Sequence, residues 1–294
     1  MKRSILISRT RKKAEKERRA IMAKRTYVAM VSLFLILLLS ACGSAEGSKI
    51  EEIMSEASEV NKDLQSYAVK TETEQVIKMG KQGNNGLPEG GIPIQSTIDA
   101  VHQVEPMAFH QTIESMGQTT EQYYTDKGLY MTNPAGDGWV KAPEKVLEQL
   151  QALNVNSQTP AEQMEFLEEY TEDFQLTSEE GHYILTFQSE GENVQKLMED
   201  SLKETLPSGQ LPEKLLEGLT VNDLEYTMKI DQDTYYPEMF HLDMNLEIEE
   251  NGEQVELKQS IYSEFSRFNE IEEIVVPQNI LNQAEEMEDM PGLF

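Results

Sequence analysis

The sequence holds one cysteine, Cys42, and four histidines among its 294 residues. A single thiol excludes an intramolecular disulfide and any metal site built from several cysteines. The histidines have none of the spacings that metal sites use, and neither a phosphate-binding glycine loop nor a Gly-x-Ser-x-Gly nucleophile motif is present. We therefore predict no catalytic residues, no metal, no cofactor and no enzymatic activity.

Basic residues are scarce after residue 26. Residues 1–26 contain eleven of the 25 Lys and Arg but only two of the 53 Asp and Glu, so the rest of the chain has a formal charge near −37. Such a charge repels nucleic acid and anionic lipid headgroups, with screening beyond about 8 Å at physiological salt. No nucleic-acid partner is expected. The acidity has two interpretations, recruitment of cations or basic partners and simple solubility of an exported protein.

An apolar run follows the basic segment and covers Tyr27 to Ala41. It is shorter than the ~20 residues of a transmembrane helix and suits the core of a signal peptide. The run ends in Leu39-Ser40-Ala41-Cys42, an apolar residue and two small residues before the only cysteine, which is a lipobox. This pattern predicts cleavage between Ala41 and Cys42, with S-diacylglyceryl and N-palmitoyl groups on Cys42. The protein would then be lipid-anchored at the extracytoplasmic face of the cell membrane. The alternative is a single-pass anchor with an incidental cysteine.

These features divide the chain into four parts. Residues 1–41 are the predicted signal peptide, although Met22 begins a signal of ordinary length and residues 1–21 could precede the true start. Residues 42–48 are the predicted lipidated tether, 49–287 a single domain and 288–294 an acidic tail.

Hydrophobic periodicity predicts the elements of the domain. A capping box at Ser48 opens a helix that continues to Leu64. Alternation of period two predicts strands within 66–74, 92–104, 107–113, 121–125, 128–132, 183–187, 224–230, 240–248 and 255–265. Helical spacing predicts central helices within 143–153, 159–170, 194–202 and 215–219, and a last helix from Pro277. Clean alternation indicates antiparallel strands with one apolar face that needs a cover. The predicted fold is therefore α+β, a large curved antiparallel sheet, or half-barrel, with helices on its concave face.

The sequence resembles a family of Gram-positive lipoproteins of uncharacterised function with a fold similar to the LolA and LppX-like lipoprotein carriers. Beside the lipobox, the resemblance rests on Tyr67 after an amphipathic helix and on the segments Pro106–His110, Glu121–Tyr130, Gly138–Lys141, Asp233–Pro237 and Ile274–Pro277. It covers the whole exported region. It implies an open half-barrel whose apolar inner face can hold an acyl chain or a lipopeptide, and it implies no catalytic residue.

Six apolar or aromatic residues are the candidates to line such a site: Tyr67, Met107, Phe109, Tyr124, Tyr130 and Trp139. The loop Gly80–Gly91 is a candidate flap. The fifteen methionines suit a lipid-accommodating cavity or ordinary core filling. Asp231 and Asp233 suggest calcium only weakly, because the segment lacks the glycine and distant glutamate of an EF-hand, and a turn is the better interpretation. The alternative function is a cell-envelope module that contacts protein or cell wall without a small ligand.

Overall fold

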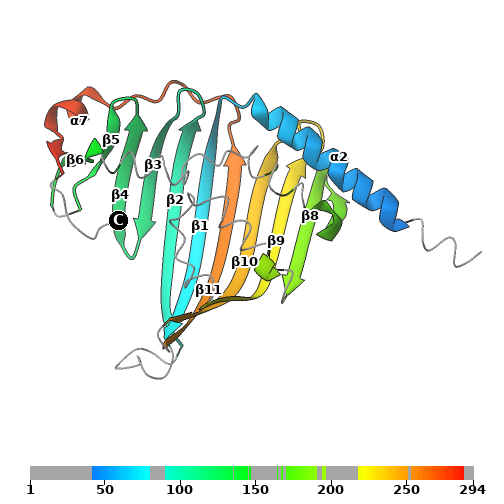
Figure 1. Cartoon of the computed structure of the whole chain (residues 1–294). Helices are drawn as coiled ribbons and strands as arrows, with labels where there is room; N and C mark the ends of the chain where they lie inside the picture. Colours follow the sequence, from blue (N-terminus) through cyan, green and yellow to red (C-terminus); the bar gives the residue numbers. More distant parts are fainter. Residues whose placement is uncertain are drawn as a thin grey trace, which may run out of the picture. The chain divides into compact units, whose positions relative to one another are not determined.

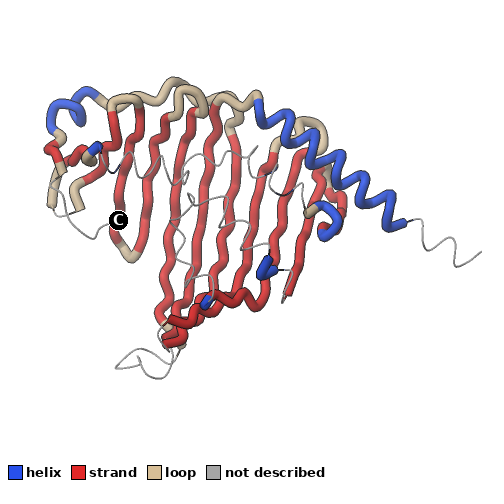
Figure 2. The backbone as a smooth tube through the Cα atoms, viewed as in Figure 1, coloured by secondary structure: helices blue, strands red, loops and turns tan. Residues whose placement is uncertain are grey.

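The computed structural model describes residues 42–79, 90–134, 136–144, 146, 164, 167, 170–190, 194–196, 218–250 and 253–287. Most of these residues belong to β-strands (Figures 1 and 2). The elements are α2 (Cys42–Lys62), β1 (Ser66–Met79), β2 (Ile92–Gln103), β3 (Ala108–Ser115), β4 (Gln118–Thr125), β5 (Gly128–Thr132), β6 (Trp139–Lys141), η1 (Thr171–Asp173), β7 (Phe174–Glu179), β8 (His182–Glu190), β9 (Leu219–Asp231), β10 (Pro237–Glu250), β11 (Glu253–Ser266), α7 (Gln278–Gln283) and β12 (Glu285–Glu286).

All twelve strands form one sheet, in the order β12-β6-β5-β4-β3-β2-β1-β11-β10-β9-β8-β7. Two meanders, β1 to β6 and β7 to β11, build the two halves, and neighbouring strands are antiparallel except for the short β12–β6 pair. The halves meet where β1 pairs with β11, in a ladder that runs from Ala68↔Ser266 to Met79↔Val255. We call this ladder the central seam.

The two faces of the sheet differ in charge. On β1, Val69, Thr71 and Thr73 lie on the face that we call inner, whereas Lys70 and Glu72 lie on the outer face. The strand registers carry this division across the sheet. Apart from the two glutamates that end β10 and begin β11, no described inner-face position of β1–β11 carries Asp, Glu, Lys or Arg. The period-two alternation in the sequence therefore separates an uncharged face from a charged one.

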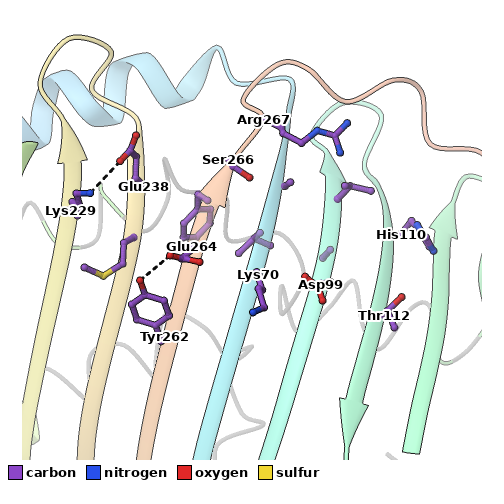
Figure 3. Close-up of a pocket in the computed structure, with 16 residues that line it drawn as sticks. Lys70, Asp99, His110, Thr112, Lys229, Glu238, Tyr262, Glu264, Ser266 and Arg267 are labelled. Atoms are coloured by element: carbon purple, nitrogen blue, oxygen red, sulfur yellow. Dashed lines mark hydrogen bonds and ion pairs between the residues drawn. The ribbon is translucent and has the colours of Figure 1, made fainter. Parts of the chain in front are cut away.

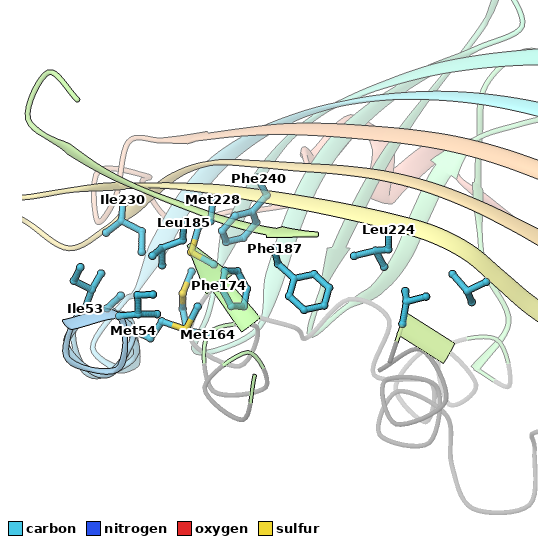
Figure 4. Close-up of a cluster of buried hydrophobic side chains, with 14 of the residues drawn as sticks. Ile53, Met54, Met164, Phe174, Leu185, Phe187, Leu224, Met228, Ile230 and Phe240 are labelled. Carbon is cyan, nitrogen blue, oxygen red and sulfur yellow. The ribbon is translucent and has the colours of Figure 1, made fainter. Parts of the chain in front are cut away.

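Helix α2 packs against the inner face at the β7–β10 end of the sheet. Its residues Ile50, Ile53, Met54 and Ala57 recur at helical spacing and are at most 1% exposed. The cluster they join also contains the following residues of the sheet and of the segments beside it: Met164, Phe174, Leu185, Phe187, Val194, Leu219, Val221, Leu224, Met228, Ile230, Phe240 and Leu246. Figure 4 shows the strands arching over this cluster.

The segment after β11, residues 267–277, runs along one end of the sheet, and we call it the C-terminal strap. The Asn269 backbone N–H donates to the Ser66 carbonyl at 2.7 Å, and the Asn269 side-chain oxygen accepts from the Gln65 N–H at 2.7 Å. Farther along, the Ile274 N–H donates to Gln103 at 3.3 Å. The strap leads to α7 and then to β12, which pairs with β6 at the edge of the sheet (Figure 1).

The predicted fold class is confirmed: the sheet is large, open and antiparallel, with helical residues packed on its inner face. The predicted turn after Asp231 is confirmed, because the Asp231 carboxylate accepts hydrogen bonds from the backbone N–H groups of Asp233 and Thr234 at 3.1 and 2.8 Å. Among the described residues, no helix has the length and the apolar content that crossing a membrane requires.

Three expectations about elements were wrong. Helix α2 begins at Cys42 and not at Ser48, since glycines such as Gly43 and Gly47 weaken a helix by about 1 kcal/mol each without ending it. Leu219, expected in a helix, is the first residue of β9 and pairs with Ile248. Strands β6, β7 and β12 were not predicted.

Residues 1–41, most of the predicted central helices, most of the Gly80–Gly91 loop and the acidic tail lie outside the described residues.

Removing the Ile53 side chain tests the packing of α2. Ile53 is fully buried, so Ile53→Ala should lower the free energy of unfolding by about 2–5 kcal/mol through lost burial and the remaining cavity. Glu56, exposed on the same helix, provides the control, and Glu56→Ala should change it by less than about 0.5 kcal/mol. Urea unfolding followed by circular dichroism measures both. Equal effects would contradict the packing described here.

Candidate functional site

A continuous row of rings crosses the inner face, and we call it the aromatic row. Successive ring centroids lie 4.9 to 6.4 Å apart, within the range of favourable aromatic pairs. In order of contact the row contains Phe187, Phe174, Tyr226, Phe240, Phe265, Tyr67, His102, Phe109 and Tyr124. It therefore connects both halves of the sheet.

Strand register explains how these rings meet. Tyr67 lies directly opposite His102, His102 opposite Phe109, and Phe109 opposite Tyr124, so four neighbouring strands each place one ring at the same level. At the central seam the Phe265 ring, whose backbone partner is Val69, reaches diagonally to Tyr67 with a centroid separation of 6.0 Å. The row thus depends on the alignment of β1 with β11.

His102 is the titratable ring in the middle of the row. It stacks on Tyr67 at a centroid separation of 4.9 Å and an interplanar angle of 12°. Burial lowers the pKa of His102 to about 4, from an ordinary value of 6.5, because the charged form loses its hydration. The imidazole is therefore neutral at physiological pH. Burial likewise raises the pKa of Tyr226 well above its usual range, so this phenol is also uncharged.

The inner face beside the row, over β11, β1, β2 and β3, is half-buried and carries isoleucines between small polar residues. Ile98, opposite Ile113 on β3, lies beside Thr71 of β1. The Thr71 hydroxyl is 2.9 Å from that of Ser263 across the central seam. This surface offers apolar contact together with neutral hydrogen-bonding groups and no charge.

Three of the six predicted site residues come together in the row. Tyr67, Phe109 and Tyr124 are all buried there, and Phe109 stacks on Tyr124 at 5.4 Å. Met107, in the turn between β2 and β3, packs beside the cluster that contains Phe109 and is partly buried.

Tyr130 and Trp139 lie on the opposite side of the sheet, which corrects their assignment to the same site. Tyr130 pairs with Tyr123 across β4 and β5 on the outer face, and it forms a buried cluster with Val276 and Ile280. Trp139 packs against this cluster. Both residues had the aromatic character of site residues, but their strand positions point them toward the C-terminal strap and α7.

The sequence alone did not single out the other rings of the row. Phe240 and Phe265 lie on strands whose alternation was recognised, so their face was predictable, but their proximity to Tyr67 depends on the register of the central seam. The four histidines, His102 among them, were considered only as metal ligands. The place of His102 directly opposite Tyr67 follows from the β1–β2 register.

The outer face bears an open groove of about 710 Å³ over β2, β1, β11 and β10 (Figure 3). Its charged lining mixes signs, with Lys70, Lys229 and Arg267 beside Asp99, Glu238 and Glu264. The Tyr262 hydroxyl donates to Glu264 at 3.0 Å. This groove is polar and charged, in contrast to the inner face.

Comparison with known proteins places the chain in a family. The chain belongs to DUF6612, a family of unknown function, whose model matches residues 49–285. The prediction of an uncharacterised family is thereby confirmed. No curated protein matches the chain.

Solved structures similar to this chain include LprF from Mycobacterium bovis, at 13% identity and a TM-score of 0.39 over 78% of this chain and 97% of that one. A LolA superfamily protein from Nitrosomonas europaea matches at 10% identity and a TM-score of 0.25, over 78% and 95% of the two chains. A DUF1329 family protein from Desulfovibrio piger matches at 8% identity and a TM-score of 0.24, over 75% and 91%.

The lowered pKa of His102 predicts a pH-dependent stability. The unfolded chain binds a proton at this position below about pH 6.5, whereas the folded chain does so only below about pH 4, so stability is lost as the pH falls through this window. At pH 5 the loss is about 2 kcal/mol. His102→Phe keeps a ring in the row and should remove this component. Urea unfolding of both proteins at pH 7.5 and pH 5 measures the difference, and parallel losses would refute the assignment.

Proposed function

We propose that this protein is a membrane-anchored extracytoplasmic lipoprotein that binds an apolar or amphiphilic ligand, such as a lipid or lipopeptide, on the inner face of its half-barrel. On this proposal the protein is a binding protein and not an enzyme. Tyr67, Phe109 and Tyr124 would form the floor of the site, with Met107 at its margin.

The observation that carries the proposal is the uncharged inner face. Outside residues 1–26 the chain has a formal charge near −37, yet the inner-face positions of β1–β11 exclude charge except at the turn that joins β10 and β11. An acyl chain can pack on such a surface without leaving a charged side chain desolvated. Half-buried isoleucines such as Ile98 and Ile113 would supply apolar contact, and hydroxyls such as that of Thr71 would bind neutral polar groups of an amphiphile.

Substitution of Ile98 tests the ligand-binding face, with the adjacent residue of the same strand as control. Ile98 is on the inner face and Thr97 on the outer, and both are half-buried. Ile98→Gln should weaken ligand retention about fivefold to tenfold, because an amide replaces apolar contact, whereas Thr97→Gln should leave it unchanged. Each protein is purified from its host membranes in amphipol, and noncovalently bound molecules are extracted and measured by mass spectrometry per mole of protein.

Two results would contradict the ligand proposal. One is the absence of any apolar molecule above the level found with an unrelated lipoprotein prepared in the same way. The other is equal retention by the two variants. The first result would favour the alternative, a cell-envelope module that binds protein or cell wall through its surface.

The anchor has its own test. The lipobox Leu39-Ser40-Ala41-Cys42 supports lipidation at Cys42 after cleavage. Cys42→Ala removes the thiol that accepts diacylglycerol, so labelled fatty acid should no longer be incorporated and the uncleaved precursor should accumulate. Metabolic labelling and immunoblotting measure both, with Ser44→Ala as control. Continued labelling of the Cys42→Ala protein would overturn the anchor.

A further inference from the structure

Three side chains with metal-binding groups converge on the outer face near one end of β8, β9 and β10. They are His182, Asp231 and Glu238, and one ligand atom from each lies within 4.8 Å of the others. His182 pairs with Asp231 across β8 and β9, so both point to the same face. No short sequence motif predicts this group, because its members come from three strands.

A β-bulge places Glu238 in this group. Pro237 pairs with Ile230 and Met239 pairs with Lys229, so Glu238 is an extra residue between two consecutive pairs. Bulges redirect a side chain from the regular alternation. Here the Glu238 carboxylate reaches across β9 and lies 2.9 Å from Nε2 of His182.

The charged groups around the three side chains have both signs. Two carboxylates face one imidazole, and the nearby Lys229 ammonium lies 3.7 Å from the Glu238 carboxylate. Asp231 is fixed in place by the Thr234 hydroxyl at 2.8 Å, which leads the causes that hold the pKa of this carboxyl below its usual value. Both Lys229 and Glu238 also line the outer groove (Figure 3).

The hydrogen bonds within the group leave one polar atom unsatisfied. Nδ1 of His182 is buried and has no hydrogen-bond partner among the residues that the structure describes. The side chain itself is 19% exposed, and Glu238 is 39% exposed, so solvent ions reach the group.

We propose that His182, Asp231 and Glu238 bind a divalent transition-metal cation, for which Zn²⁺ is the probe. One imidazole nitrogen and two carboxylate oxygens are ligands that Zn²⁺ accepts at roughly 2.0–2.2 Å each, which places the donor atoms about 3–4 Å apart. The three ligand atoms lie within 4.8 Å of one another, and His182 Nε2 and the Glu238 carboxylate are 2.9 Å apart, so side-chain rotations toward a common centre complete the site. The two carboxylates balance the charge of the ion. In the metal-free protein, the Lys229 ammonium supplies part of the positive charge that the ion would supply.

Substitution of a ligand and substitution of Lys229 should change the Zn²⁺ affinity in opposite directions. His182→Gln and Glu238→Gln each remove a ligand and should lower the Zn²⁺ affinity at least about tenfold, because loss of even an outer-shell partner of a metal ligand costs about 10- to 100-fold. Lys229→Met removes a cation that repels the ion and should raise the affinity, by about threefold or more. His241→Gln is the matched control, because His241 lies 3.3 Å from Asp243 on the same face and belongs to no group of three such ligands among the residues that the structure describes.

The experiment uses the full chain, purified in detergent and stripped with EDTA. Isothermal titration calorimetry with Zn²⁺ should show one saturable site per chain, with an affinity at least about tenfold lower in His182→Gln and Glu238→Gln, higher in Lys229→Met and unchanged in His241→Gln. Zn²⁺ should also raise the Tm of the wild type and not of the two ligand variants. Circular dichroism verifies that each variant is folded.

Absence of saturable Zn²⁺ uptake would overturn the proposal, and so would uptake that His182→Gln and Glu238→Gln leave intact. Because the site is on the outer face, ligand retention on the inner face is independent of the result.

Discussion

The pairing of β1 with β11 is the constraint on which the rest of the described structure depends. Each half of the sheet is a meander of neighbours close in sequence, but only this ladder joins them into one surface. The aromatic row crosses the ladder through the contact of Phe265 with Tyr67. A shift of one residue would turn every inner-face side chain of one half to the outer face, so this register fixes both the row and the uncharged surface.

The division of charge between the faces gives the acidity of this protein a structural meaning. Carboxylates occupy outer-face and turn positions, where water and neighbouring Lys or His side chains solvate them, as Glu238 is near Lys229 and His182. The inner face is held neutral even at its single imidazole, because burial keeps His102 uncharged. A surface that avoids charge within so acidic a chain is a specific feature of the strand pattern, and general solubility does not explain it.

Much of this fold could be predicted from local patterns, and the exceptions have physical causes. The period-two alternation of apolar residues identified most strands and the face on which their side chains lie. Asp231 indicated the turn that follows it. Tyr130 and Trp139 were misassigned because aromatic character does not say which face a ring occupies or what covers it; here Ile280 and the C-terminal strap do so. Contacts between strands distant in sequence, such as Phe265 with Tyr67, depend on register, which no local pattern encodes. The group formed by His182, Asp231 and Glu238 could not be predicted for the same reason.

The central seam also sets the order in which the chain can fold. Thr71 and Ser263, which touch across it, are 192 residues apart, so closing this ladder carries a large loop-entropy cost and awaits β11, the final strand of the second meander. Until β11 has been made, β1 has one partner and one open edge of unpaired backbone groups, next to an uncharged apolar face. Such an edge recruits other strands and favours aggregation. The nascent N-terminal half therefore needs protection during synthesis, and truncation before β11 would leave a chain that self-associates.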